Sequence, residues 1–289
     1  VKAKPRRRGG FILINWRFYV MTALLLRGRT LTFHRYPERV DDHSAYAYEE
    51  DGGLLIGDGK IIVAGTRNDG ANDHFALVRY NSDGTPDAGF GANGVVITVF
   101  NGAAQGNAVA IDTNGKIVVA GTSDGDFAVA RYNSSNGSPD TTFGGTGMVV
   151  TDFSSLGGNF TTAAGHAVAI DANNRIVVAG FVRNGSEFND FALVRYNSNG
   201  ALDTTFGING IVTSSIQSQQ DDQAYGVAIQ PADGKIVVVG DTKGAPGQFV
   251  MVRYSNVGTL DTTFGANGIV FAASTKVGPG RAVLLTGIG

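Results

Sequence analysis

Short apolar segments alternate with polar turns along most of this chain, and one arrangement of them recurs. In residues 165–180, two runs rich in Val, Ile and Ala flank an Asp/Asn turn, which predicts two strands joined by a tight hairpin. A third apolar run follows at 190–197, and a shorter fourth run follows at 210–214 after a second polar turn. The pattern therefore predicts a unit of four antiparallel strands.

This unit occurs four times with a period close to 60 residues. The glycine that ends the second predicted strand stands at Gly65, Gly121, Gly180 and Gly240, with spacings of 56, 59 and 60 residues. The Arg-Tyr pair that ends the third strand begins at Arg79, Arg131, Arg195 and Arg253, with spacings of 52, 64 and 58 residues. Two anchors agree on the period while the loops between them vary, so we interpret the repeat as a structural module.

Three motifs of the unit carry a resemblance to a known family. The second strands read DGKIIVAG (58–65), NGKIVVAG (114–121), NNRIVVAG (173–180) and DGKIVVVG (233–240), and the third strands read FALVRYNSDG (75–84), FAVARYNSSNG (127–137), FALVRYNSNG (191–200) and FVMVRYSNVG (249–258). DTTFG follows at 140–144, 203–207 and 261–265, with DAGFG at 87–91. Over residues 58–289 the chain resembles the delta-60 repeat family of bacterial surface and secreted proteins. The resemblance implies an all-β propeller of four-stranded antiparallel blades, and it implies almost nothing about chemistry because a fold does not carry a function.

We expect blades over residues 41–100, 105–153, 164–216 and 223–273. Residues 281–285 align with the first strand of a unit, and the N-terminal apolar segments 11–15, 18–26 and 30–36 can supply three more strands. A fifth blade built from both termini would close the ring and protect its edge strands. This divides the chain into an atypical basic and apolar segment, 1–40, and propeller repeats, 41–289. Alternatively, residues 1–57 are the altered start of a longer array, whose ring has six or seven blades.

Charge is unevenly distributed along the 289 residues. Residues 1–40 carry a net charge of +9, so the remainder must carry −11 to give the overall −2. An acidic repeat body argues against nucleic acid as a partner. The basic run before Phe11–Leu26 resembles a signal peptide, but Asn15 and Arg17 interrupt the apolar stretch, and for the same reason we expect no membrane span. The chain has no Cys, which is compatible with secretion, and we expect an extracellular or surface-attached monomer.

Several recurring motifs have a structural interpretation. The turn Asn81-x-Asp83-Gly84 and its copies are typical of Asx-stabilised turns, which we favour over calcium loops because the fourth copy has Val257 at a ligand position. The four arginines that precede Tyr recur together with four aspartates, Asp87, Asp140, Asp203 and Asp261, so we expect buried ion pairs that hold each blade together. The G-x-S-x-G sequence at 121–125 has the pattern of a nucleophile elbow, but a strand follows it where that motif needs a helix.

The candidate site comes from what differs between units. In the strand order that we expect, the first strand of each blade is innermost, and its opening residue faces the mouth of a central channel. Alignment of the units places five different polar residues there: Tyr46, Asn107, His166, Tyr225 and Arg281. Clefts with a few convergent polar groups are where ligands bind, so we take Tyr46, Asn107 and Tyr225 as candidate binding residues. The alternative is that these side chains only solvate a water-filled channel.

Two hypotheses about function follow. The first is a non-catalytic extracellular β-propeller for binding or surface architecture, with a small molecule or a glycan as ligand. The second is a hydrolase of esters, lactones or phosphotriesters, in which His166 acts as general base and Arg281 binds an anionic or carbonyl group. In that case Asp42 and Asp222, with Asp41 and Asp221 beside them, are the candidate metal ligands, and calcium is the first candidate because the site is rich in oxygen.

Overall fold

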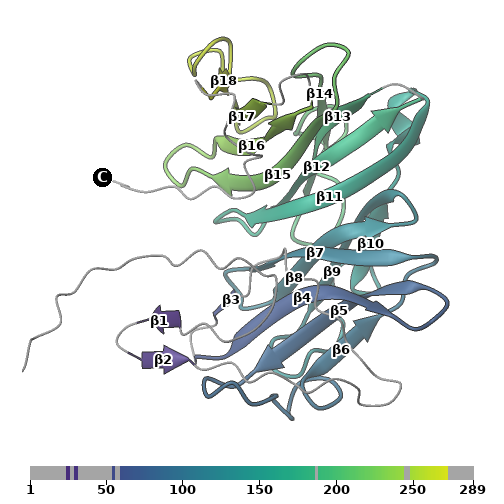
Figure 1. The fold of residues 1–289 in the computed structure, drawn as a ribbon, viewed down its shortest axis with the longest axis vertical. Helices are drawn as coiled ribbons and strands as arrows, with labels where there is room; N and C mark the ends of the chain where they lie inside the picture. Colours follow the sequence, from purple (N-terminus) through teal and green to yellow (C-terminus); the bar gives the residue numbers. More distant parts are fainter. Residues whose placement is uncertain are drawn as a thin grey trace, which may run out of the picture.

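The computed structural model describes residues 59–185, 188–243 and 248–272, and in addition the backbone of three short strands, β1 (Leu24–Leu26), β2 (Arg29–Leu31) and β3 (Leu54–Leu55). Four antiparallel sheets of four strands follow one another in chain order (Figure 1). The only helix in the described part is a single 3-10 turn, η1 (Phe153–Leu156). The prediction of an all-β architecture with four-stranded units is therefore confirmed.

We call the four sheets blades 1 to 4. Blade 1 contains β3, β4 (Ile61–Asn68), β5 (Asp73–Tyr80) and β6 (Val95–Thr98), and blade 2 contains β7 (Ala104–Ile111), β8 (Ile117–Ser123), β9 (Asp126–Tyr132) and β10 (Met148–Thr151). Blade 3 contains β11 (Phe160–Ile170), β12 (Ile176–Asn184), β13 (Asn189–Tyr196) and β14 (Ile211–Ser214), and blade 4 contains β15 (Asp222–Ile229), β16 (Ile236–Thr242), β17 (Gln248–Tyr254) and β18 (Ile269–Phe271). The predicted fifth blade lies outside the described residues, apart from the pairing of β1 with β2, where Leu25 is opposite Thr30.

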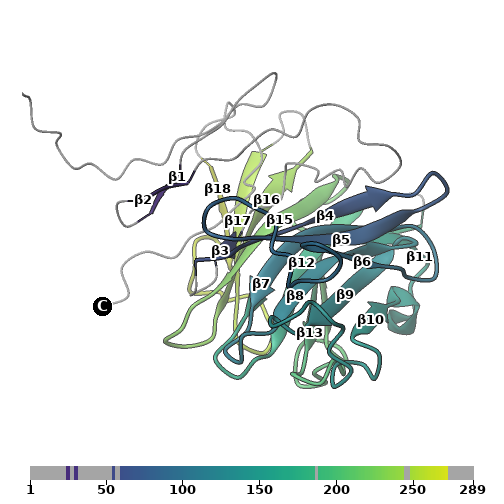
Figure 2. The ribbon, with the colours of Figure 1, turned by 90° about the horizontal axis from the view of Figure 1, so that it is seen from below.

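Within each blade the strands are paired in sequence order, and consecutive blades contact each other through the first strand of the later blade. Thus β7 contacts β4 and β11, and β11 contacts β15, so β7, β11 and β15, the first strands of blades 2 to 4, are neighbours (Figure 1). Figure 2 shows the same blades from below. The fourth strand of each sheet lies at the opposite edge. The sequence prediction that the first strand is innermost agrees with this arrangement.

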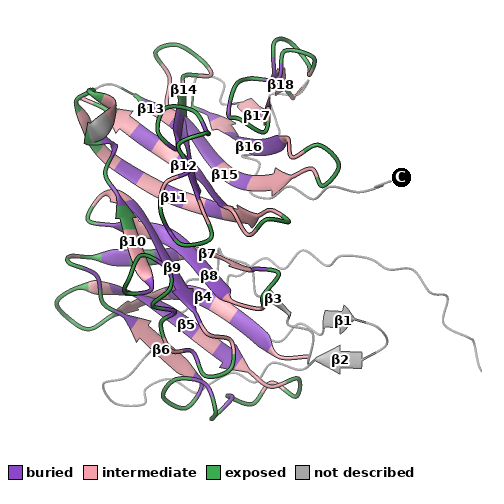
Figure 3. Ribbon diagram, turned by 180° about the vertical axis from the view of Figure 1, so that it is seen from behind, coloured by how far each residue is buried: buried purple, intermediate pink, exposed green. Residues whose placement is uncertain are grey.

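Apolar side chains on both faces of each sheet form the core between neighbouring blades. The strands are buried along their middle, and the exposed positions gather in the loops (Figure 3). Phe75, Leu77 and Phe90 of blade 1 pack against Val119 and Tyr132 of blade 2. Equivalent clusters join blades 2 and 3 and blades 3 and 4. Among the described residues, blades 2 and 3 therefore contribute one face to each of two cores, which explains why their strands read as continuous apolar runs.

The repeated glycine lies inside the second strand, which continues beyond the end that we predicted, and it is required by close packing inside the blade. A Cβ atom on Gly180 would lie 1.8 Å from the carbonyl oxygen of Ala164, and one on Gly240 would lie 2.0 Å from that of Gln223. Gly121 is in the same situation, 1.9 Å from the oxygen of Gln105. A side chain at this position would force the first two strands apart, which explains why the anchor of the repeat is a glycine.

The repeated arginine and aspartate form the predicted buried pairs. In blade 3 the Nε atom of Arg195 donates a hydrogen bond of 2.8 Å to Oδ2 of Asp203, and the guanidinium lies 4.4 Å from the ring centroid of Phe206. The same pair and ring contact occur in the other three blades, at Arg79, Arg131 and Arg253. Since the set is present four times, its role is to hold each blade together rather than to form one site.

The two remaining motifs are turns. Oδ1 of Asp83 accepts a hydrogen bond from the backbone N–H of Thr85, and Asn199 does the same for Ala201, so the Asx-turn prediction is confirmed. In the G-x-S-x-G segment, Asp124 and Gly125 have φ angles of 53° and 86°, as in the two-residue hairpin turns with positive φ at both positions. Ser123 is the last residue of β8 and is buried, and strand β9 follows the turn, which excludes a nucleophile elbow at this place.

Candidate functional site

Three of the five predicted ring residues lie in the described part, and each occupies a β-bulge. The register between the first and second strands shifts at Asn107 in β7, at His166 in β11 and at Tyr225 in β15. These residues lie inside their strands rather than opening them, because the strands begin earlier, at Ala104, Phe160 and Asp222. That detail of the prediction was wrong: buried residues such as Ala104 extend the strand before the bulge. A bulge re-aims the side chain of its extra residue, and bulges are common beside functional sites.

Two of the bulge residues bind the next blade. Nδ2 of Asn107 donates a hydrogen bond of 2.8 Å to the carbonyl oxygen of Gly165, and Nδ1 of His166 lies 3.0 Å from the carbonyl oxygen of Ala224. In both cases the acceptor is the residue just before the next bulge. Asn107 and His166 therefore share one structural task, which is to connect neighbouring inner strands by a side chain–backbone hydrogen bond.

The contact to Ala224 also fixes the tautomer of the neutral His166 ring. A carbonyl oxygen only accepts, so Nδ1 must carry a proton, and the neutral ring then has its lone pair on Nε2. The ring is stacked on Tyr225, with centroids 5.1 Å apart and planes inclined by 7°, and it lies 5.5 Å from the ring of Phe181. The hydroxyl of Tyr225 donates a 2.6 Å hydrogen bond to Oε1 of Gln223. Blades 3 and 4 thus present a half-buried group of aromatic and polar rings.

Another predicted site residue, Asp222, lies in the core and not in the ring of bulge residues. Tyr46, Arg281, Asp41 and Asp42 lie outside the described residues. Asp222 is fully buried, on the same side of β15 as Ala224, which packs in the core between blades 3 and 4. Its Oδ2 accepts hydrogen bonds from the backbone N–H groups of Ile216 and Gln217, at 2.7 and 2.9 Å. Burial raises the pKa of Asp222 to about 6, and the charges of Asp190 and Asp221 add to that rise.

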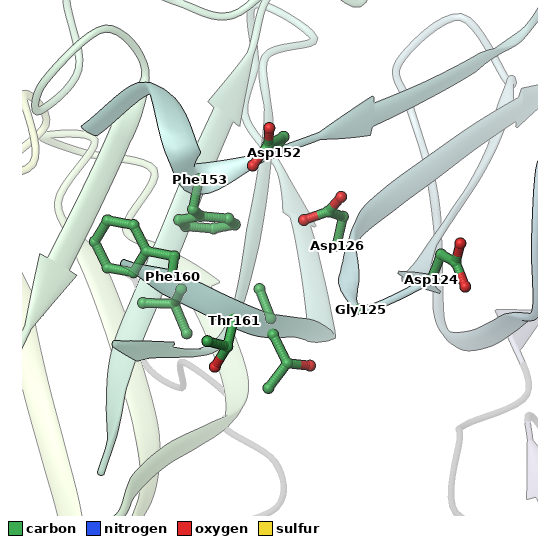
Figure 4. A pocket seen from close by; sticks show the side chains of 10 residues that line it. Asp124, Gly125, Asp126, Asp152, Phe153, Phe160 and Thr161 are labelled. Atoms are coloured by element: carbon green, nitrogen blue, oxygen red, sulfur yellow. The ribbon is translucent and has the colours of Figure 1, made fainter. Parts of the chain in front are cut away.

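An acidic hollow lies between blades 2 and 3, and no motif in the sequence indicated it. It has a volume of about 240 Å³ and is lined by Asp124, Asp126 and Asp152 together with Phe153, Phe160 and Ala163 (Figure 4). Burial raises the pKa of Asp126, and the charges of Asp152 and Asp124 act in the same direction. The carboxylate of Asp152 instead caps η1 by accepting from Ser154, which lowers its pKa. The only sequence signal for this hollow is the presence of three aspartates, at 124, 126 and 152.

The described residues contain no group of three His, Cys, Asp or Glu side chains that could hold a metal ion. A metal site of the predicted kind, with several carboxylates, is thus not found in this part of the chain. Among the same residues, no helix has the length and apolar character needed to span a membrane.

Comparison with known proteins agrees with the fold and says little about chemistry. A family model described as a domain of unknown function (DUF5122) β-propeller matches four segments, residues 57–90, 113–143, 172–206 and 232–264. No curated protein matches the chain. A crystal structure of a quinonprotein alcohol dehydrogenase-like protein from Bacteroides thetaiotaomicron is similar over 78% of this chain, with 12% sequence identity and a TM-score of 0.39. The matched region covers 49% of that protein, and a similarity this distant supports no inference about activity.

Proposed function

Because this chain is a β-propeller repeat protein whose four units match the DUF5122 family, we propose that it is a non-catalytic binding or structural module that acts outside the cell. The observation that supports the proposal is the use of the varied bulge residues as connectors. Asn107 and His166 each bind the carbonyl of the next inner strand. Side chains committed to joining blades give a rigid inner surface, which suits recognition of a ligand better than chemistry that must move protons.

The ligand-binding part of the proposal centres on His166, Tyr225 and Phe181. Two stacked rings beside a third offer apolar faces next to polar edges. Such a surface fits a sugar or another small polar molecule, which packs a C–H face on an aromatic ring and forms hydrogen bonds at its rim. We therefore infer a glycan or small-molecule ligand, bound by a single copy of the chain.

The direct test is a binding screen against glycan and small-molecule arrays, followed by the variant His166→Asn. Asparagine is the residue that occupies the equivalent bulge in blade 2, so it can restore the hydrogen bond to the next blade while it removes the ring. We expect the folded variant to lose at least tenfold in affinity for any ligand found. Unchanged affinity would place binding elsewhere, and fractionation of the source cells tests the proposed location independently.

A hydrolase remains the second candidate, and one observation favours it. The hydrogen bond from Nδ1 of His166 to the carbonyl of Ala224 leaves the lone pair of the neutral ring on Nε2, which is the arrangement of a general base oriented by the backbone. A panel of chromogenic esters, lactones and phosphotriesters, assayed with and without a chelator, distinguishes the two functions. Turnover that disappears in His166→Asn would support the hydrolase over the binding module.

A further inference from the structure

Besides the hydroxyl of Tyr254, three buried side-chain oxygens between blades 3 and 4 have no hydrogen-bond partner among the described residues. They are Oδ1 of Asp222, Oγ1 of Thr242 and Oδ1 of Asn189. Asp222 and Thr242 are 0% exposed and Asn189 is 6% exposed. Each unpaired buried polar atom costs free energy, so three at one interface require an explanation.

The three residues lie at one end of this interface. Asp222 and Thr242 are direct partners across β15 and β16, and partners of this kind have their side chains on the same face of the sheet. That face is the one from which Ala224 packs towards blade 3. Asn189 begins β13 of blade 3, and its backbone N–H donates a 3.0 Å hydrogen bond to Oδ1 of Asp221, the neighbour of Asp222. Residues with unpaired oxygens, from strands of both blades, therefore lie at this end of the interface.

The equivalent places between the other blades are built differently. The residue three positions before the bulge is Ala104 in blade 2 and Ala163 in blade 3, both buried and apolar, whereas it is Asp222 in blade 4. Phe100 and Phe153 pack against the first two interfaces, and the smaller Ile216 packs against the third. The third interface thus has an aliphatic side chain where the others have a phenylalanine, and a carboxylate where the others have an alanine. Blades 2 and 3 form without either feature.

Hydrogen bonds within the chain satisfy only half of that carboxylate. Oδ2 of Asp222 accepts from Ile216 and Gln217, whereas Oδ1 has no donor. The charged groups that act on it electrostatically, Asp190 and Asp221, are both acidic and disfavour its ionised form. Among the described residues, no ion pair joins this carboxylate to a positive charge. The other two unpaired oxygens, from an amide and a hydroxyl, are ligands of the type that hard cations prefer.

We propose that Asp222, Thr242 and Asn189 form a binding site for a hard cation, with calcium as the first candidate, between blades 3 and 4. Calcium takes six to eight oxygen ligands and accepts irregular geometry, so backbone carbonyls and water would complete the shell. The site joins strands of two blades and the loop that carries Ile216, so the cation would act as a clamp on this interface. It is separate from the rings at His166 and Tyr225, and it does not depend on the function proposed above.

Thermal unfolding of chelator-treated protein, with calcium, magnesium, sodium or no added cation, tests the site, and metal content after dialysis gives the stoichiometry. We expect one calcium per chain and a rise in melting temperature on the order of 5 °C at saturation. Asp222→Asn keeps one oxygen to accept from Ile216 and Gln217 but removes the charge, and Thr242→Val removes one ligand without touching that loop. Both variants should lose the bound calcium and the rise in melting temperature.

Asp126→Asn, in the acidic hollow between blades 2 and 3, is the matched control and should respond to calcium like the wild type. Loss of the response in this control, with retention in Asp222→Asn, would overturn the proposal in favour of the hollow. Equal responses in the wild type, Asp222→Asn and Thr242→Val would also overturn it. So would the absence of any response to the four conditions in the wild type, since the oxygens would then be satisfied by water or by protonation. If Asp222→Asn does not fold, Thr242→Val still decides the question.

Discussion

The guanidinium of Arg195 in blade 3 donates through Nη1 to the backbone carbonyl of Asn256 in blade 4. Arg79 and Arg131 reach the turns of their following blades in the same way, at Ser134 and Ser198. The arginine that pairs with an aspartate inside its own blade is thus also a link to the next one. The arginine belongs to the Arg-Tyr motif, and the carbonyl that accepts from it belongs to the Asx turn of the next blade. This contact explains why the two motifs recur together.

Arg195→Ala should lower the free energy of unfolding by about 1 to 3 kcal/mol, because it leaves the buried carboxylate of Asp203 without its main partner. Urea unfolding measures the change. Arg253→Ala is the control: its described contacts, with Asp261 and Thr263, lie within its own blade, and its side chain is 19% exposed against 3% for Arg195. The control should cost less, and an equal or larger loss would contradict the role of the interblade link.

The melting temperature should fall as the pH is lowered below about 4. Burial alone would raise the pKa of Asp203, but hydrogen bonds from Thr205 and the charge of Arg195 outweigh it and lower the pKa below its usual value. A lowered carboxylate pKa stabilises the folded state above the unfolded pKa, and that stabilisation is lost as the pH falls through the folded value. Asp140 has the same balance of causes. Thermal scans from pH 7 to pH 2 on wild type and Asp203→Asn check this, and the variant should show a shallower fall.

Gly240→Ala should prevent or strongly weaken folding, by more than about 3 kcal/mol, since the new Cβ would overlap the carbonyl oxygen of Gln223. Gly89→Ala serves as the comparison, because its Cβ would meet only Oδ1 of Asp87 at 3.4 Å, an ordinary contact. Circular dichroism and soluble yield of both proteins give the result. A stable Gly240→Ala protein would mean that the first two strands of the blade can separate more easily than their packing indicates.

Tyr196→Phe should cost about 1 kcal/mol through loss of the 2.6 Å hydrogen bond between its hydroxyl and Oγ1 of Thr151 in the preceding blade. Both residues are buried, so Thr151 would be left unsatisfied. The double variant Thr151→Val, Tyr196→Phe should recover part of the loss, because neither polar group then remains unpaired. Chemical denaturation of the two single variants and the double variant forms the cycle, and strict additivity would show that the two hydroxyls do not interact.

The sequence predicted the features that depend on local pattern, and it missed those that depend on how blades face one another. The alternation of apolar segments and polar turns, together with two repeated anchors, predicted the four-stranded units. The recurrence of arginine and aspartate with the same period predicted the pairing of Arg195 with Asp203. It could not place Asp222, which was expected beside Asp42 at the channel mouth. The alternation of side chains along β15 turns Asp222 to the same face as Ala224, towards blade 3 and into the core. The sequence also could not predict which carbonyl Asn107 or His166 binds, because a β-bulge at each residue sets the direction of its side chain.

The bulge at His166 also affects the stability of the inner strands. His166→Ala should lower the melting temperature by a few degrees, because the ring links β11 to the carbonyl of Ala224 and packs on Tyr225. His166→Asn should recover much of that loss, since Asn107 forms the corresponding link from blade 2 to blade 3. Differential scanning calorimetry of the three proteins measures both effects. If His166→Asn is no more stable than His166→Ala, the ring contributes through stacking on Tyr225 and Phe181, and the hydrogen bond to Ala224 is not what joins the two blades.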